Sequence, residues 1–341
     1  MRIGYSMWGF LGNGVADADA PDGAQAYRRS FLDQLQAQRH EVVLLQRNRD
    51  RLDAGDDQPG FHWDPTGLPR LDALILEWRW SIEGRNTTPC GSLGHTCDLH
   101  RQTELLDRYT HDRGTPTLIW DLDRRLAADD PLRKVTNVAV GEVAFLATPG
   151  AYRLPCPVPD RRLDSVDPKI LVRRVREPLV YVGHQNDRDD HFGRFFAPAA
   201  HVVQHQVVGR WTETRAWPHV TFTGPAPHHT IDQTYGQALA TVLLSPERFW
   251  RVGHMTTRWW QALLAGCLPL IPAETRGTDL YLPSELHVRD GQQVIDQIAW
   301  LWNLAGTKDH IALLEACLAR LQPYRSSKVA RHALRILRDL S

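Results

Sequence analysis

The sequence has few cysteines, no excess of charge of either sign and no long apolar run. Its five cysteines form an odd, scattered set in 341 residues, which argues against a disulfide framework and favours a reducing compartment. Forty basic and forty acidic side chains cancel, so no overall field draws the protein to nucleic acid or membrane, although a local patch still can. The apolar runs are too short for a membrane span, and the N-terminal segment lacks a signal-peptide pattern. We therefore expect a cytoplasmic protein without a membrane span.

Motifs that would identify several enzyme classes are also missing. The sequence has no G-x-S-x-G elbow, P-loop or H-E-x-x-H pair. The glycines after the first predicted strand do not have the G-x-G-x-x-G spacing, and Gln46 stands where an acid would bind the NAD ribose. NAD binding is therefore disfavoured, whereas Arg47 and Arg49 keep NADP as an alternative.

One group of residues resembles a zinc site only superficially. Cys90, His95, Cys97 and His100 lie within eleven residues, but the two cysteines are too far apart and no second pair follows. No metal site is predicted. A loop containing glycine is favoured there, with His100 available as a general base because imidazole titrates near neutral pH.

The length and the pattern of elements predict two α/β domains. A chain of 341 residues exceeds one comfortable core. Apolar strand-like runs alternate with helical patterns, which is typical of doubly wound parallel sheets. A segment with five prolines, residues 149–168, suggests the linker. We expect domains at 1–160 and 161–322, and a terminal helix, 323–341, that returns to the first domain and carries basic residues on one face.

The most informative stretch is Ala240 to Pro283. It predicts a buried strand, a polar loop from Ser245 to Thr257, a short helix ending at Gly266 and another strand. Ligands of open parallel sheets bind at the carboxyl ends of strands, where this loop would lie. A similar strand and polar loop, with His184 and Arg188 after Gly183, open the second half.

The segments TYGQALATVLLSP and QALLAGCLPLI resemble the donor half of GT-B type glycosyltransferases. The resemblance extends over most of the second half and, in architecture only, over the first. It implies two Rossmann-like domains facing a cleft, with a nucleotide sugar held mainly by the second domain. The chain departs from the family pattern at Gln261, near the position of a glutamate that holds the ribose hydroxyls. Glutamine can bind a diol but supplies no negative charge.

The resemblance implies donor-binding residues in both halves. In the first, the loop that approaches the sugar corresponds to Gly12, Asn13 and Gly14. In the second, strand-end loops and the helix contribute cations for the diphosphate, because a leaving diphosphate needs positive charge. They also contribute hydroxyls and an amide that can bind phosphate or sugar. These residues are Gly183, Arg188, Arg210, His254, Thr256, Thr257, Arg258 and Gln261. No metal is required, since arginine can supply the charge.

The acceptor side is assigned to the first half. Glu77 and Asp121 each follow a predicted buried strand, and Trp78 and Trp80 stand next to Glu77. A carboxylate beside aromatic planes suits the deprotonation of a hydroxyl on a sugar or base acceptor. We therefore expect Glu77, Asp121 or His100 to remove the acceptor proton. A surface ion pair between Glu77 and Arg79, and a turn cap or a metal ligand at Asp121, are the alternatives.

These features predict a glycosyltransferase that moves a sugar from a nucleotide-sugar donor to a hydroxyl. The acceptor is a hydroxymethylated pyrimidine in DNA, as for phage DNA glucosyltransferases of similar size, or else a glycan or small metabolite. The basic clusters of residues 173–176 and of the terminal helix agree with DNA. A noncatalytic nucleotide-sugar binding protein and a sugar-nucleotide epimerase of the same shape are the other two readings.

Overall fold

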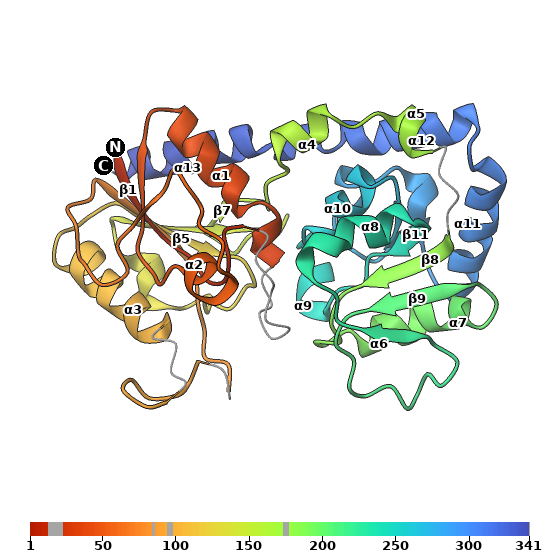
Figure 1. Ribbon diagram of the computed structural model, residues 1–341, viewed down its shortest axis with the longest axis horizontal. Coiled ribbons are helices and arrows are strands. Elements are labelled where there is room, and N and C mark those ends of the chain that lie inside the picture. Colours follow the sequence, from red (N-terminus) through yellow and green to blue (C-terminus); the bar gives the residue numbers. More distant parts are fainter. Residues whose placement is uncertain (13–22, 84–85, 94–97, 173–176, 341) are drawn as a thin grey trace. The chain divides into compact units, whose positions relative to one another are not determined.

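The structure is a computed structural model that describes residues 1–12, 23–83, 86–93, 98–172 and 177–340. These residues form two compact units (Figure 1). Unit 1 contains the described residues up to Pro157 and again from Ser326, and unit 2 runs from Val158 to Arg325. Among the described residues, no helix is both long enough and apolar enough to cross a bilayer.

Unit 1 is built on a seven-stranded sheet with the order β3-β2-β1-β4-β5-β6-β7. All of its strand pairs are parallel. The order reverses between β1 and β4, which is the switch point where ligands of such sheets bind. The strands are β1 Arg2–Ser6, β2 Glu41–Leu44, β3 His62–Trp63, β4 Ala73–Glu77, β5 Thr117–Asp121, β6 Val138–Glu142 and β7 Tyr152–Arg153.

Helices cover both faces of this sheet, as the alternating pattern requires. On one face, α1 (Arg28–Ala37) packs against the C-terminal helix α13 (Ser326–Asp339), as Figure 1 shows. On the other, α3 (Asp98–Leu105), which continues as a π-helical turn to His111, joins the core formed by β2, β4 and β5. The short helix α2 (Arg49–Ala54) follows β2. The indole of Trp120 is fully buried against Phe31 and Tyr27 and anchors the α1 side of the core.

Helix α13 has one buried apolar face and one exposed basic face. Val329, Ala333 and Leu337 are at most 3% exposed. The basic side chains on the outer face are exposed, namely Lys328, Arg331, Arg335 and Arg338. Burial of one leucine side chain contributes on the order of 1.5–3 kcal/mol. This apolar face therefore holds the last fourteen-residue helix on unit 1, although the rest of unit 1 ends at Pro157.

Unit 2 repeats the same winding in a six-stranded sheet with the order β10-β9-β8-β11-β12-β13. Its strand pairs are parallel too. The switch point here lies between β8 and β11. The strands are β8 Glu177–Val182, β9 His205–Val208, β10 Phe222–Gly224, β11 Ala238–Val242, β12 Leu268–Pro272 and β13 His287–Val288.

The helices of unit 2 also lie on two faces. One layer contains α8 (Ile231–Gly236) and α10 (Arg258–Leu264), and the other contains α7 (Ala197–Ala200) and α11 (Gly291–Leu304). Four short helices and α12 complete the unit, namely α4 Asp160–Asp164, α5 Pro168–Leu171, α6 Asp189–His191, α9 Glu247–Trp250 and α12 Lys308–Ala319.

The fold class predicted from the sequence is confirmed, since both sheets are parallel and carry helices on both faces. The two strands predicted within Ala240 to Pro283 are present as β11 and β12. One detail differs, since the loop from Ser245 to Thr257 contains α9.

Candidate functional site

In unit 2, the carboxyl end of β8 passes directly into a glycine and a histidine. Gly183 has φ of 155°, and a Cβ atom there would lie 2.7 Å from the guanidinium carbon of Arg258 and 2.8 Å from the hydroxyl oxygen of Tyr181. Any larger residue would therefore displace both groups. Gly183 lets a cation and a phenol lie directly against the backbone at the switch point of this sheet.

Three arginines from separate segments of unit 2 surround His184. The Nη1 atom of Arg188 donates to the His184 carbonyl at 3.1 Å, and the backbone N–H of Arg210 donates to His184 Nδ1 at 2.9 Å. Arg258, the first residue of α10, lies over Gly183. Burial, together with the positive charges of Arg258, Arg188 and Arg210, lowers the pKa of His184 to about 4. The three arginines predicted from the sequence thus belong to one cationic cluster.

The polar atoms of this cluster are only partly used within the protein. The Nη1 atom of Arg258 and the hydroxyl of Tyr181 are buried and have no hydrogen-bond partner among the described residues. Arg188, which is 6% exposed, also holds its own loop through the Asn186 carbonyl. Buried donors of this kind normally find an acceptor. An anion bound beside Gly183 would supply it.

The remaining predicted donor residues lie next to Arg258 in the sequence. Gln261 is one helical turn further along α10 and 4% exposed, and Thr257, which precedes the helix, is 5% exposed. Thr256 is half-buried. His254 is buried and stacks on Phe249 with ring centroids 3.9 Å apart, so its ring is part of the local packing.

Two groups at the same edge were not identified from the sequence. Trp211 follows Arg210 and donates its indole N–H to the Gly183 carbonyl at 2.8 Å. Glu274 follows β12 and accepts hydrogen bonds from Arg194 and His191. Their positions directly after strands were the available signal.

The low pKa of His184 predicts how the stability of unit 2 depends on pH. The folded state keeps His184 neutral down to about pH 4, whereas the unfolded chain binds a proton near pH 6.5. The unfolded state therefore holds more protons between these values, so stability falls as the pH is lowered through this window, by up to about 3 kcal/mol. Urea unfolding of the wild type and of His184→Gln between pH 7 and pH 4 checks this. An equal pH dependence in both proteins would contradict it.

In unit 1, Glu77 at the end of β4 forms a buried ion pair rather than an exposed one. Both carboxylate oxygens accept from Arg28, each at 2.8 Å, and the Tyr5 hydroxyl donates to Oε1 at 2.6 Å. Glu77 is 2% exposed and Arg28 is 0% exposed. The partner of Glu77 is thus Arg28, whereas Arg79 is buried separately and donates to Ser6 and Met7. This arrangement favours a structural role for Glu77 over proton abstraction.

Asp121, at the end of β5, closes the turn that follows it. Its two oxygens accept the backbone N–H groups of Arg125 at 2.9 Å and Leu126 at 2.8 Å, and it is fully buried. Burial raises the pKa of Asp121, and the two backbone hydrogen bonds oppose that rise. Of the alternatives left open for Asp121, the structure shows the turn cap.

The other predicted residues of unit 1 lie in separate places. His100 is exposed in the first turn of α3. Asp98, which was not identified from the sequence, begins the same helix. Gly12 donates its N–H to Asp50 at 2.7 Å, whereas Asn13, Gly14, His95 and Cys97 lie outside the described residues. Within the described residues, no three His, Cys, Asp or Glu side chains gather to hold a metal ion.

The arginines of the NADP alternative are engaged elsewhere. Arg47 and Arg49 both bind the carboxylate of Asp53, at 2.9 and 2.7 Å. The two cations that the sequence offered for a ribose phosphate at the end of β2 are therefore already paired with a carboxylate.

Solved structures of glycosyltransferases match this chain along almost its whole length. T4 phage β-glucosyltransferase in complex with UDP-glucose superposes with a TM-score of 0.66 at 12% identity, covering 99% of each chain. An α-glucosyltransferase in complex with UDP and a 13-mer DNA containing an HMU base gives 0.63 at 11% identity and 99% of each chain. AviGT4, a glycosyltransferase involved in avilamycin A biosynthesis, gives 0.59 at 14% identity, covering 99% of this chain and 97% of that one.

The chain has the GT-B glycosyltransferase fold. No family model matches the sequence, and no curated protein matches it either. Identities of 11–14% establish the fold alone, so the chemistry must come from this chain's own residues. In this GT-B chain, the cationic cluster at the β8 end is the best-defined candidate site.

Proposed function

We propose that the protein is a glycosyltransferase that moves a sugar from a uridine diphosphate sugar to a hydroxyl acceptor. The observation that carries this proposal is the convergence of Arg188, Arg210 and Arg258 around His184, at the switch point of the unit 2 sheet. Two structural neighbours are glycosyltransferases in complex with UDP-glucose and with UDP, which supports a uridine diphosphate donor.

The cluster has the chemistry that the leaving group needs. When the bond between the anomeric carbon and the diphosphate oxygen breaks, negative charge develops on that oxygen. Arg258, whose buried Nη1 lacks a partner among the described residues, would donate to it without reorganisation. Gln261, one turn along α10, is positioned to hydrogen-bond donor hydroxyls. No step is assigned to a metal, although another T4 phage β-glucosyltransferase structure is described with Mn²⁺.

The acceptor hydroxyl must lose its proton as the new glycosidic bond forms. Glu77 and Asp121 already accept internal hydrogen bonds in the buried core, so we assign the base to the first turn of α3, which contains Asp98 and the exposed His100. We propose a hydroxymethylated pyrimidine in DNA as the acceptor. A glycan or small metabolite is the alternative.

A thermal-shift panel tests the donor assignment. A ligand that binds only the folded state raises the free energy of unfolding, by about 2.7 kcal/mol at a hundredfold excess over Kd. The melting temperature rises as a result. We expect UDP and UDP-glucose to raise it, and NADP and uridine to leave it nearly unchanged. Runs with EDTA and with Mn²⁺ test the metal dependence of binding. Absence of a shift with every nucleotide sugar would refute the proposal, and a shift without turnover of any acceptor would point to a binding protein.

A further inference from the structure

Two tryptophans and an arginine lie at the switch point of the unit 1 sheet. Trp8 follows β1 and Trp80 follows β4, the two strands between which the strand order reverses. Their ring centroids are 6.2 Å apart, and the guanidinium carbon of Arg125 lies 5.5 Å from the Trp80 ring centroid. Both indoles are half-buried and Arg125 is exposed. We call these three residues the tryptophan platform.

The tryptophan platform is held from behind by buried polar side chains. The side-chain amide of Gln102 in α3 accepts a hydrogen bond from the Arg79 N–H at 2.8 Å and donates one to the Arg79 carbonyl at 3.0 Å. Asn86 donates to the Trp80 carbonyl at 3.0 Å. Asp121 fixes the backbone of Arg125. The segment that carries Trp80 is thus clamped on both sides, so the indole is positioned before any ligand arrives.

The buried carboxylates predicted to be catalytic serve this same edge. The N–H of Trp8 lies 3.4 Å from Glu77 Oε2, and Asp121 caps the turn that presents Arg125. Glu77 and Asp121 therefore act as positioning residues for the tryptophan platform.

The shape and charge of the tryptophan platform indicate its ligand. The two indoles are already within the range of direct ring contact, so a third ring would stack on an outer face of the pair rather than between them. The guanidinium of Arg125 forms no ion pair among the described residues and rests on Trp80 through a weak cation–π contact. An aromatic surface beside an unpaired cation is the combination that binds a base together with its phosphate.

A second buried donor lies at the same edge. Gln46 is 8% exposed and accepts the Met7 N–H through Oε1 at 3.1 Å, but its Nε2 has no partner among the described residues. Met7 immediately precedes Trp8. A polar group on a ring stacked at this edge is a suitable acceptor for this amide.

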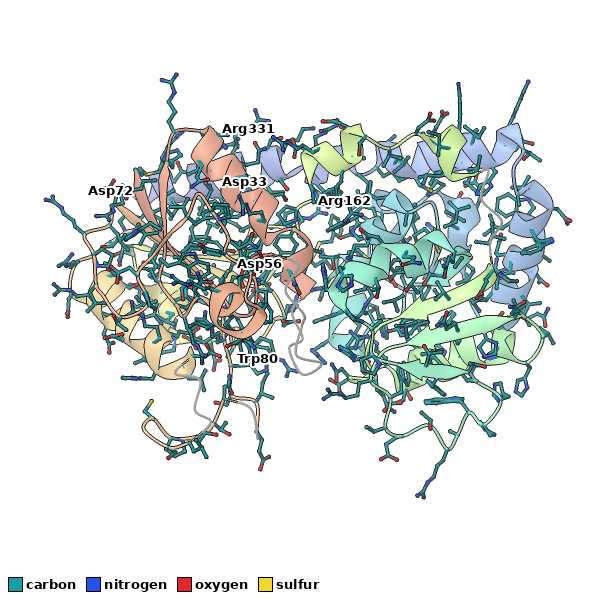
Figure 2. The ribbon with its side chains drawn as sticks, in the orientation of Figure 1. Asp33, Asp56, Asp72, Trp80, Arg162 and Arg331 are labelled. Carbon is teal, nitrogen blue, oxygen red and sulfur yellow. The ribbon has the colours of Figure 1, made fainter. Side chains whose placement is uncertain are left out.

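We propose that the tryptophan platform binds the acceptor as an unstacked nucleobase of a nucleic-acid strand, with Arg125 on the adjacent phosphate. The inference rests on the proposed function for the reaction itself, and it specifies the acceptor as a planar ring rather than a saturated sugar. The basic face of α13 is a separate surface, since Arg331 and Trp80 lie at opposite margins of unit 1 in Figure 2.

The tryptophan platform predicts that Trp80→Ala weakens binding of a single-stranded oligodeoxynucleotide carrying one 5-hydroxymethylcytosine, measured by fluorescence anisotropy without donor. Loss of one stacked base corresponds to a 5- to 150-fold weaker Kd, because base–aromatic stacking contributes about 1–3 kcal/mol. Trp80→Phe should recover most of the affinity. Trp302→Ala is the control, because Trp302 is 52% exposed on α11.

Salt dependence tests the phosphate contact in the same assay. Arg125→Gln should lower the slope of log Kd against log salt by about 0.7, the value for one phosphate on a single strand. Arg113→Gln is the matched control: Arg113 is also exposed and lies 6.0 Å from an aromatic ring, that of Tyr109, but before β5 rather than after it.

The outcomes separate this inference from the proposed function. The proposal that the tryptophan platform binds a nucleobase is wrong if Trp80→Ala binds the oligonucleotide as the wild type does. It is also wrong if transfer to a methyl glucoside acceptor falls equally in Trp80→Ala. The UDP-glucose melting shift of each variant is measured in parallel. A normal shift in Trp80→Ala with weakened oligonucleotide binding supports both proposals, whereas no shift in the wild type refutes the donor assignment and leaves the binding result standing.

Discussion

Arg258→Ala is expected to lower kcat/KM for glycosyl transfer by about 10²- to 10³-fold, the typical cost of removing one donor aimed at developing negative charge. Arg258 lies over Gly183 at the end of β8, and its buried Nη1 has no hydrogen-bond partner in the described part of the chain. The lost interaction is greatest when charge appears on the diphosphate oxygen, so kcat should fall more than the affinity for UDP.

A conservative variant and a matched control sharpen this prediction. Arg258→Lys keeps the charge but not the planar fork, so its activity should lie between the wild type and Arg258→Ala. Arg162→Ala is the control: Arg258 lies over the ring of Tyr181 and Arg162 over that of Trp260, but the Arg162 guanidinium pairs with Asp232. Its kcat/KM should stay within about twofold of the wild type.

The pKa of His184 gives an independent measure of the same cluster. Arg258 is the strongest of the three charges that act on this imidazole, so Arg258→Ala should raise the pKa of His184 from about 4 toward its ordinary value. Histidine NMR titration measures it. Unchanged activity together with an unchanged pKa would show that Arg258 is not part of the site.

The sequence could predict the fold and the cationic cluster because both follow from local order along the chain. Strand-like runs alternating with helices dictate parallel sheets, and residues just beyond each strand must gather at one edge. Arg188, Arg210 and Arg258 therefore could be grouped without coordinates, although they are separated by 22 and 48 residues.

The first half shows where sequence reasoning fails. Glu77 and Asp121 were predicted to be general bases because each carboxylate follows a strand. The partner of Glu77, however, comes from a distant chain segment, and the partners of Asp121 are backbone N–H groups of the turn that follows it. Arg28 is 49 residues from Glu77, and nothing local marks it as a partner. For the same reason Trp8 and Arg125 were missed, since only the β1-β4-β5 order places them near Trp80.

Glu77→Ala is expected to destabilise unit 1 by about 3–5 kcal/mol, because it leaves the Arg28 guanidinium buried without its counter-charge. Urea unfolding followed by near-UV circular dichroism measures the shift in midpoint. Glu41→Ala, which removes an exposed partner of Arg2, should cost about 1 kcal/mol or less. The double variant Arg28→Met/Glu77→Leu should recover much of the loss, since it removes both charges together.

The stability and the activity of Glu77→Gln together decide between a scaffold and a base. A scaffold role predicts a less stable protein whose remaining folded fraction still turns over, whereas a general base predicts a stable protein with kcat lowered by 10²-fold or more. His100→Ala and Asp98→Asn should give stable proteins with lowered kcat, because His100 is exposed and Asp98 is only half-buried in the first turn of α3. A stable, inactive Glu77→Gln variant would identify Glu77, at the end of β4, as the general base. It would also remove the reason for treating the buried carboxylates as supports of the tryptophan platform.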